Sequence, residues 1–380
     1  MTEIRIAHGE AGNQLTQFLR LNGTERILII ASERCWLRSG LNAVLEQQLP
    51  KLQIVLFHQF TPNPGFEEVM AGCELRNSQQ SQMILGLGGG SAMDIAKSVA
   101  LLANYSEQEA RNIIETSSQN FTDKVCPLVL IPTTAGSGSE ATHFAVIYLD
   151  DKKYSLATPV MLPDLSIVDG SQTYSAAPLL AASCGIDALC QAIESYWAVS
   201  ATKDSQAYAI KAIKILNQHL ITAVLSKAER VSNNDARNKV AEAACLAGQA
   251  INISKTTAAH AYSYYLTSKH QIPHGHAVSL CFPAVAQCNF NSKKTLLSSG
   301  ELANRYKKLF DVIGVSGIEE FILWFKNLTA TIGLEQNLEK LGFKPQQEME
   351  GFLTSVNIER LKNNPAIIDI DKFKQLFLDR

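Results

Sequence analysis

The sequence has no marked excess of either charge and no long hydrophobic run. Its 380 residues carry 34 Lys and Arg against 36 Asp and Glu, which excludes the basic surplus typical of proteins that bind nucleic acid or anionic membrane surfaces. No stretch approaches the ~18 consecutive apolar residues of a transmembrane helix. The opening MTEIRIAHGEAG also lacks the basic and apolar regions of a secretory signal. We therefore expect a cytoplasmic protein with no nucleic-acid partner and no membrane partner.

Cysteine pairs at redox or zinc-finger spacing are absent as well. None of the eight cysteines belongs to a C-x-x-C motif, and several lie in apolar runs such as LCFPAVAQC. We expect reduced, buried cysteines rather than a disulfide framework. What the chain does have is length and a 46% hydrophobic content, which suffice for two domains that each have a core.

Two regions of different periodicity divide the chain. In residues 1–175, short β-rich runs alternate with helix-like stretches such as 92–103, which predicts a parallel sheet covered by helices. In residues 176–380 the apolar residues follow a helical period instead, which predicts an all-α domain. The fold class is thus an α/β N-terminal domain followed by a helical C-terminal domain. The predicted strands are 27–30, 54–57, 83–87, 128–131 and 144–148.

A glycine-rich turn follows the third predicted strand. In MILGLGGGSAMDIAKSVALLA, a short apolar run leads into Gly88, Gly89, Gly90 and Ser91 and then into an amphipathic helix. Such a turn lets the backbone approach a phosphate, and the free N–H groups of the helix start favour an anion. The alternative is a tight turn in which Ser91 is an ordinary N-cap. The motif is neither a P-loop nor the usual G-x-G-x-x-G fingerprint.

A second loop, IPTTAGSGSE at 131–140, follows another apolar run. Its hydroxyl groups on Thr133, Thr134 and Ser137 are predicted to line the same cofactor groove. Alone this pattern is weak, and its value comes from sharing a sheet edge with the glycine-rich turn.

The candidate metal ligands lie in the second half of the chain. His260 falls on an alanine-rich helix face, where a free imidazole would be costly, and His274 stands between Pro273 and Gly275 at a helix start. With Asp187 they make one carboxylate and two imidazoles, a set typical of catalytic Zn²⁺ or Fe²⁺. A metal beside a dinucleotide favours hydride transfer.

In this order the motifs resemble the iron-containing (group III) alcohol dehydrogenase family. They are GLGGGSAMDIAK, PTTAGSGSE, LPDLSIVD, GIDALCQAIESY, the segment 260–275 and NNP at 363–365. The resemblance implies the dehydroquinate synthase-like fold of that family, NAD(P)-linked interconversion of alcohols and aldehydes, and at least a homodimer. It places metal ligands at Asp187, Gln191, His260 and His274. It places cofactor contacts at Gly88, Gly89, Gly90, Ser91, Asp94, Thr133, Thr134 and Lys153.

Two departures from the family pattern concern the metal. Members that use iron usually have histidine at position 191, whereas Gln191 offers only an amide oxygen. A three-ligand site with an additional water is our preferred interpretation, and the choice between Fe²⁺ and Zn²⁺ stays open. Members also often carry a histidine four residues after the ligand at 260. Here that residue is Tyr264, so we expect the proton to pass through a phenol, a water or a substrate hydroxyl.

A third departure concerns the cofactor. The family usually has an acid after the second strand to bind the adenine ribose of NAD, whereas this chain has Ser32 there, with Arg34 close by. Loss of the acid beside a cation favours NADPH. The alternative is NADH, with Glu33 shifted into the role of the acid.

Lys255 is the candidate substrate residue. It stands about a turn and a half before His260 and is suited to hold an anionic group, although a solvated lysine at a helix start explains it equally. The surrounding stretch is similar to the phosphonoacetaldehyde reductase branch of the family, which implies a small anionic aldehyde and phosphonate metabolism. Two alternatives remain: a lyase of the dehydroquinate synthase type, and a metal-free binding protein that lost its metal through Gln191.

Overall fold

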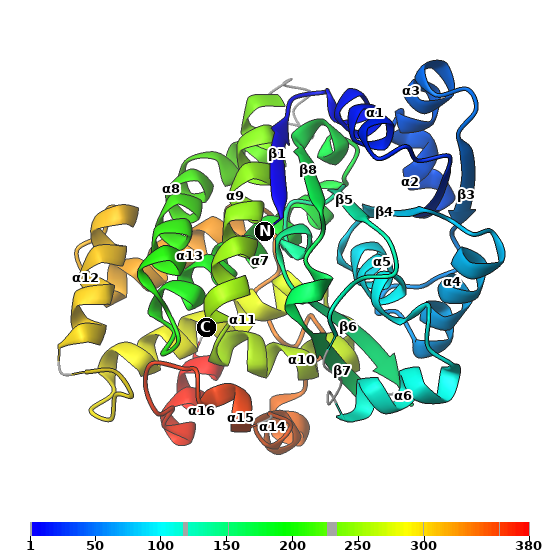
Figure 1. The fold of residues 1–380 in the computed structure, drawn as a ribbon. Coiled ribbons are helices and arrows are strands. Elements are labelled where there is room, and N and C mark those ends of the chain that lie inside the picture. The colour runs from blue at the N-terminus through cyan, green and yellow to red at the C-terminus, as the bar shows by residue number, and fades with distance from the viewer. Residues whose placement is uncertain are drawn as a thin grey trace. The chain divides into compact units, whose positions relative to one another are not determined.

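The computed structural model describes residues 2–116, 121–150, 152–225, 234–298, 300–356 and 358–379. The chain divides into two compact units (Figure 1). The α/β unit comprises Met1–Thr134 and Gly138–Ser175, and the helical unit comprises Ala135–Ser137 and Ala176–Arg380. The predicted fold class, a parallel-sheet domain followed by a helical domain, is confirmed.

The α/β unit is built on a six-stranded parallel sheet with strand order β1-β8-β5-β4-β2-β3. Strands such as RILII and LVLIP are apolar along almost their whole length because both faces of the sheet are covered. The strands are β1 (Glu3–Ala7), β2 (Arg26–Ile30), β3 (Gln53–Phe57), β4 (Met83–Gly88), β5 (Leu128–Pro132) and β8 (Leu165–Asp169).

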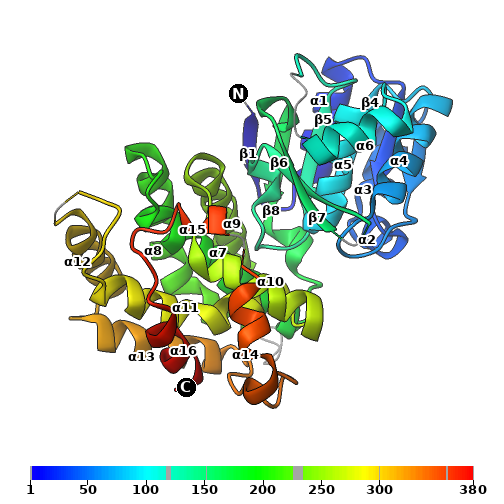
Figure 2. The same cartoon turned by 90° about the horizontal axis from the view of Figure 1, so that it is seen from below.

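Helices cover both faces of the sheet (Figures 1 and 2). Successive strand residues point to opposite faces, so in β2 Ile27 and Ile29 join one core while Leu28 and Ile30 join the other. The first core packs α1 (Ala11–Leu21), α2 (Glu33–Arg38) and α3 (Leu41–Gln48). The second packs α4 (Phe66–Ser78), α5 (Gly90–Leu102) and α6 (Glu107–Thr116).

The strand prediction was correct for the first four runs, which are β2, β3, β4 and β5, and misplaced the fifth. β6 (Phe144–Leu149) pairs antiparallel with β7 (Lys152–Ala157) in a separate two-stranded sheet, and is not part of the parallel sheet. Its alternating burial shows the reason, because only one face of β6 is covered. The strands β1, β7 and β8 were not predicted.

The helical unit packs around α7 (Pro178–Trp197), which is buried along most of its length. Its side chains are apolar on nearly all sides, as expected for a central helix. The other helices are α8 (Lys203–Leu225), α9 (Asn234–Ser254), α10 (Ala258–His270), α11 (His274–Asn291), α12 (Glu301–Ile313), α13 (Ile318–Thr331), α14 (Pro345–Thr354), α15 (Ile358–Leu361) and α16 (Ile370–Leu378).

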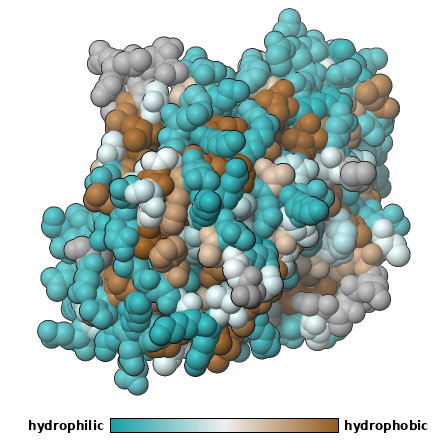
Figure 3. Space-filling view, turned by 90° about the vertical axis from the view of Figure 1, so that its left-hand side faces the viewer, coloured by the Kyte–Doolittle hydropathy of each residue, from teal (hydrophilic) through white to brown (hydrophobic). Residues whose placement is uncertain are grey.

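Among the helices that the structure describes, none combines the length and hydrophobicity needed to cross a bilayer. The cysteines other than Cys35 and Cys184 are buried. On the face drawn in Figure 3, hydrophobic side chains lie in small groups among hydrophilic ones.

Candidate functional site

A line of polar side chains crosses the apolar interior of α7. Asp187, Gln191 and Glu194 stand at positions i, i+4 and i+7 and therefore share one face of the helix. All three are buried, and Glu194 has no solvent exposure at all. Burying a carboxylate is costly unless other groups compensate its charge, so this face must meet donors or a cation.

Two histidines meet this face. His260, near the start of α10, places Nε2 3.4 Å from Oδ1 of Asp187, and His274, the first residue of α11, places Nε2 3.9 Å from the same oxygen. One potential ligand atom from each of the three residues lies within 4.8 Å of the others. The structure thus brings Asp187, His260 and His274 together from three helices.

Gly275 permits this approach of α11 to α7. A Cβ atom at position 275 would lie 2.0 Å from the carbonyl oxygen of Ser183 and 2.6 Å from Cβ of Asp187. Because the first of these atoms is backbone, a larger residue would force the two helices apart.

Glu194 fixes the orientation of His260, a role that was not predicted from the sequence. Nδ1 of His260 donates to the Glu194 carboxylate, which also accepts from the Thr257 hydroxyl at 2.6 Å and from the Ala259 amide at 2.9 Å. With Nδ1 donating, Nε2 is the nitrogen turned toward Asp187. The signal was present in the sequence, since Glu194 continues the Asp187 and Gln191 face by one turn.

The electrostatics of the metal-free cluster favour a cation. Burial alone would lower the pKa of His260, but the carboxylates of Glu194 and Asp187 outweigh burial and raise the pKa to about 10. A proton on His260 therefore balances part of the buried negative charge. A divalent metal that replaced this proton would serve the same electrostatic purpose.

The buried atoms His260 Nε2 and Gln191 Oε1 have no hydrogen bond within the described part of the chain. Gln191 donates its amide to Oδ2 of Asp187 at 3.0 Å, which orients the carboxylate and leaves the amide oxygen without a donor. A metal that displaced the proton of His260 would give Nε2 a partner among the buried carboxylates. The residues present therefore fit a divalent metal with one carboxylate and two imidazole ligands.

Tyr264 lies beside the cluster, one turn after His260 on α10. Its ring stacks on that of His274, with centroids 5.8 Å apart and planes 11° from parallel. Lys255 stands directly after α9 in a left-handed conformation with φ 60°, and its side chain is exposed.

The predicted cofactor loops follow neighbouring strands of the α/β unit. Since β5, β4 and β2 are adjacent in the sheet, the loops after their carboxyl ends meet at one edge, where α/β proteins bind nucleotides. The amide of Thr133 donates to the carbonyl of Gly88 at 2.8 Å, which joins two of the loops. Gly89 precedes α5, so Gly90 and Ser91 form its first turn, with N–H groups suited to a phosphate.

Asp94 and Lys97, both on α5, fasten the second loop. Asp94 accepts from the Ser139 hydroxyl at 2.8 Å and from the Val146 amide at 3.1 Å. Lys97 is fully buried and donates to Ser139, Thr142 and the Phe144 carbonyl, and burial lowers its pKa to about 8. No pattern in the sequence pointed to Lys97. Among the predicted contacts, Lys153 lies close enough to Asp94 to lower the pKa of that carboxyl, although burial raises it overall.

The residues expected to discriminate between NADH and NADPH follow β2. The Ser32 hydroxyl caps α2 by accepting from the amide of Cys35 at 3.2 Å, and Arg34 is exposed. Glu33, the alternative acid, pairs instead with His58 at 3.4 Å.

Ser137 differs from the other predicted cofactor contacts in the unit to which it belongs. It belongs to Ala135–Ser137, which cluster with the helical unit. There Gly136 packs on α7 so closely that a Cβ would lie 2.8 Å from the Cα of Cys184. The loop PTTAGSGSE therefore contributes residues to both units.

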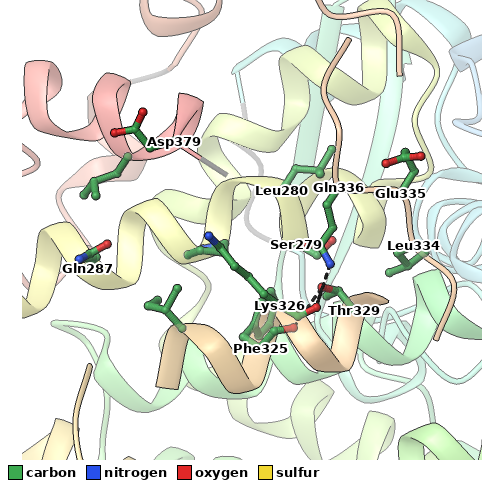
Figure 4. Close-up of a pocket in the computed structure, with 13 residues that line it drawn as sticks. Ser279, Leu280, Gln287, Phe325, Lys326, Thr329, Leu334, Glu335, Gln336 and Asp379 are labelled. Atoms are coloured by element: carbon green, nitrogen blue, oxygen red, sulfur yellow. Dashed lines mark hydrogen bonds between the residues drawn. The ribbon is translucent and has the colours of Figure 1, made fainter. Parts of the chain in front are cut away.

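A further pocket of the helical unit lies between α11, α13 and the segment 334–336 (Figure 4). Gln336 closes one side of it by donating to the Lys326 carbonyl at 2.8 Å. Its volume of about 40 Å³ holds only a few waters at ~10–15 Å³ each. None of the three candidate ligands lines it, so it is not the site described above.

The chain matches a known family along both halves. Residues 2–170 match the family described as iron-containing alcohol dehydrogenase, and residues 181–379 match the C-terminal part of the Fe-containing alcohol dehydrogenase family. Alcohol dehydrogenase 4 of Saccharomyces cerevisiae is 30% identical over 314 residues, 81% of this chain and 78% of that protein. An NADPH-dependent butanol dehydrogenase of Clostridium saccharobutylicum is 27% identical over 339 residues, 86% of this chain and 83% of that protein.

A solved structure is similar over almost the whole chain. It is the crystal structure of sulfoacetaldehyde reductase from Bifidobacterium kashiwanohense in complex with NAD⁺, with a TM-score of 0.87 and 29% identity over 99% of this chain and 96% of that chain. The family matches extend through both the glycine-rich loops and the three-residue cluster. The chain therefore belongs to the iron-containing alcohol dehydrogenase family.

Proposed function

We propose that the protein is a metal-dependent, NAD(P)H-linked alcohol dehydrogenase that acts as a reductase of small aldehydes. The observation that carries this proposal is the convergence of Asp187, His260 and His274, with ligand atoms within 4.8 Å of one another. The glycine-rich cradle after β4 supports the cofactor half of the proposal. Metal analysis, together with NAD(P)H oxidation in the presence of small aldehydes, tests it.

The chemistry needs a divalent metal to polarise the carbonyl oxygen and a reduced nicotinamide to supply the hydride. The chain's own residues prepare the site. Gln191 orients Asp187, and Glu194 keeps His260 in the tautomer that presents Nε2. We infer that Tyr264, stacked on His274, would supply the proton that the alcohol product gains.

We propose Fe²⁺ or Zn²⁺ as the metal, with three protein ligands. Because Gln191 bonds to Asp187, we infer that it positions this ligand and leaves open coordination positions for water and substrate. If the metal-free protein binds neither ion, the result would instead support the alternative of a binding protein that lost its metal through Gln191.

We propose NADPH as the preferred reductant. Ser32 offers no carboxylate to repel a 2′-phosphate, Arg34 is exposed beside it, and Glu33 pairs with His58. Replacing Ser32 with Asp should shift the ratio of kcat/KM toward NADH by about tenfold or more. An unchanged ratio would oppose this assignment.

For the substrate we propose a small anionic aldehyde such as phosphonoacetaldehyde, with Lys255 binding the anion. The similarity to a sulfoacetaldehyde reductase supports an acidic substrate. Lys255→Met should raise KM sharply for the anionic aldehyde and little for propanal. Equal effects on both substrates would remove Lys255 from this role.

We also propose that the chain forms a homodimer or larger homo-oligomer. β1 is an edge strand of the sheet, and Ile6 on it is 41% exposed, which suits pairing with another copy. Light scattering coupled to size exclusion measures the state directly, and a monomer would contradict this proposal.

A further inference from the structure

Arg360, on α15, forms a stack with Tyr264 and His274. The guanidinium carbon lies 4.8 Å from the centroid of the Tyr264 ring, and Nη1 donates to the phenolic oxygen at 2.6 Å. Tyr264 in turn stacks on His274, with ring centroids 5.8 Å apart. Together these two separations place the guanidinium within about 11 Å of the imidazole of a candidate metal ligand.

The charge of Arg360 has no carboxylate partner within ion-pair distance among the residues that the structure describes. The neighbouring Glu359 pairs instead with Lys362 at 2.7 Å. Arg360 is half-buried, and its bond to Tyr264 uses only one of five N–H donors. A partly desolvated guanidinium with unused donors is suited to bind an oxyanion with two parallel hydrogen bonds.

The segment that carries Arg360 is firmly held. Asn363 donates to the carbonyl oxygens of Ser254 at 2.7 Å and Thr256 at 2.9 Å, and its side-chain oxygen accepts from the Ser200 hydroxyl at 2.7 Å. These bonds attach the chain after α15 to the loop that leads into α10. Arg360 is therefore presented by an anchored segment, so little ordering is needed when an anion binds.

We propose that Arg360 determines specificity by binding the anionic end of the substrate, a terminal tetrahedral oxyanion such as a phosphonate or sulfonate. This inference rests on the proposed aldehyde reductase function and adds a residue to it. A two-carbon aldehyde with such a group spans roughly 5 Å, and a charged hydrogen bond adds about 2.8 Å. This reach is compatible with an Arg360 less than about 11 Å from His274. The cation–π contact with the Tyr264 ring positions the guanidinium.

The test compares Arg360→Met and Arg360→Lys with the wild type in the metal-loaded enzyme. The substrates are phosphonoacetaldehyde, sulfoacetaldehyde and propanal. Arg360→Met should lower the ratio of kcat/KM for the anionic aldehydes over propanal by about 10- to 100-fold, the loss expected for hydrogen bonds to a charged group. The loss specific to the anionic aldehydes should fall mainly on KM, and Arg360→Lys should restore part of the ratio. Any loss of kcat through the Tyr264 hydroxyl should be common to all three aldehydes. If Arg360→Met lowers the ratio more for phosphonoacetaldehyde, Arg360 favours the phosphonate dianion. If it lowers the ratio more for sulfoacetaldehyde, Arg360 favours the sulfonate monoanion.

Lys362→Met is the matched control, because it removes a cation two residues away whose side chain is 68% exposed. It should leave the ratio unchanged. Binding of 2-hydroxyethylphosphonate, measured by calorimetry, provides a second readout, and Arg360→Met should weaken it at least tenfold. Thermal unfolding and metal content establish that each variant is folded and loaded.

Two outcomes would overturn the role of Arg360. In one, Arg360→Met leaves the substrate ratio and the phosphonate affinity unchanged. In the other, it reduces activity on all three aldehydes equally, as expected if Arg360 only packs α15 against α10. If the wild-type enzyme fails to oxidise NAD(P)H in the presence of any of the aldehydes, the proposed function is overturned instead. The calorimetric comparison would then still decide whether Arg360 binds the oxyanion.

Discussion

At the residue scale, the candidate metal cluster depends on a carboxylate, Glu194, that is not one of its three candidate ligands. Glu194 is fully buried and is compensated by His260, Thr257 and Ala259. The carboxylate gives His260 a fixed tautomer, which an isolated histidine would not have. Asp187 and the two histidines were predictable from residue type, whereas this support depends on how α7 and α10 pack.

Glu194→Gln should lower metal affinity by about 10- to 100-fold, as replacement of such supporting carboxylates commonly does. The amide can present its NH₂ group to Nδ1 of His260 and so favour the wrong tautomer. Competition with a chelating dye measures the affinity. Glu348→Gln is the matched control, because Glu348 also pairs with a histidine, His270 at 3.2 Å, outside the cluster. Equal metal affinity in the wild type and Glu194→Gln would contradict this role.

Metal binding should release a proton from His260. Because the raised pKa of about 10 keeps His260 protonated at pH 8 in the metal-free protein, the ion must displace that proton to reach Nε2. The apparent metal affinity should therefore rise with pH. Below pH 10 it should fall about tenfold for each pH unit. Calorimetry of Zn²⁺ binding in buffers of different ionisation enthalpy counts the protons. A heat independent of the buffer would oppose the prediction.

At the element scale, the close crossing of α11 on α7 determines whether the two imidazoles meet the carboxylate. Periodicity predicted these helices but not their crossing, because contacts between distant segments leave no local pattern. Gly275 was visible only as a residue after His274, and its close approach to Ser183 gives it a packing role. In the α/β unit, β6 shows the same limit. Its strand character could be predicted from its own residues, whereas its pairing with β7 could not.

Gly275→Ala should abolish or greatly weaken metal binding, since the new methyl would collide with the Ser183 carbonyl and move His274 away from Asp187. Gly351→Ala is the control, because Gly351 also lies inside a helix and its Cβ would meet its nearest neighbour only at 3.5 Å. That control should be neutral or stabilising by up to about 1 kcal/mol. Metal content and thermal unfolding measure both variants, and a fully loaded Gly275→Ala protein would refute the crossing argument.

At the scale of the whole molecule, each unit carries the residues for one half of the proposed chemistry. The α/β unit has the loops after β2, β4 and β5 at a single sheet edge, and the helical unit has the candidate metal ligands. The order of motifs along the chain predicted both sets of residues. It was not enough to single out Lys97, Glu194 or Arg360, whose contacts depend on burial and on neighbours distant in sequence.

The rival lyase reaction is distinguished at this scale too, since it regenerates its nicotinamide in every turnover. Net loss of absorbance at 340 nm on addition of an aldehyde is therefore expected for the reductase alone. Absorbance that stays constant while substrate is consumed would favour the lyase.

The most direct measurement is the metal content of the purified protein set beside its activity before and after chelation. We predict one Fe²⁺ or Zn²⁺ per chain, loss of aldehyde-dependent NAD(P)H oxidation when the ion is removed, and recovery when it is returned. Asp187→Asn and His260→Ala should contain no ion and stay inactive. Full activity in protein stripped of metal, or a tightly bound ion in both variants, would contradict the account.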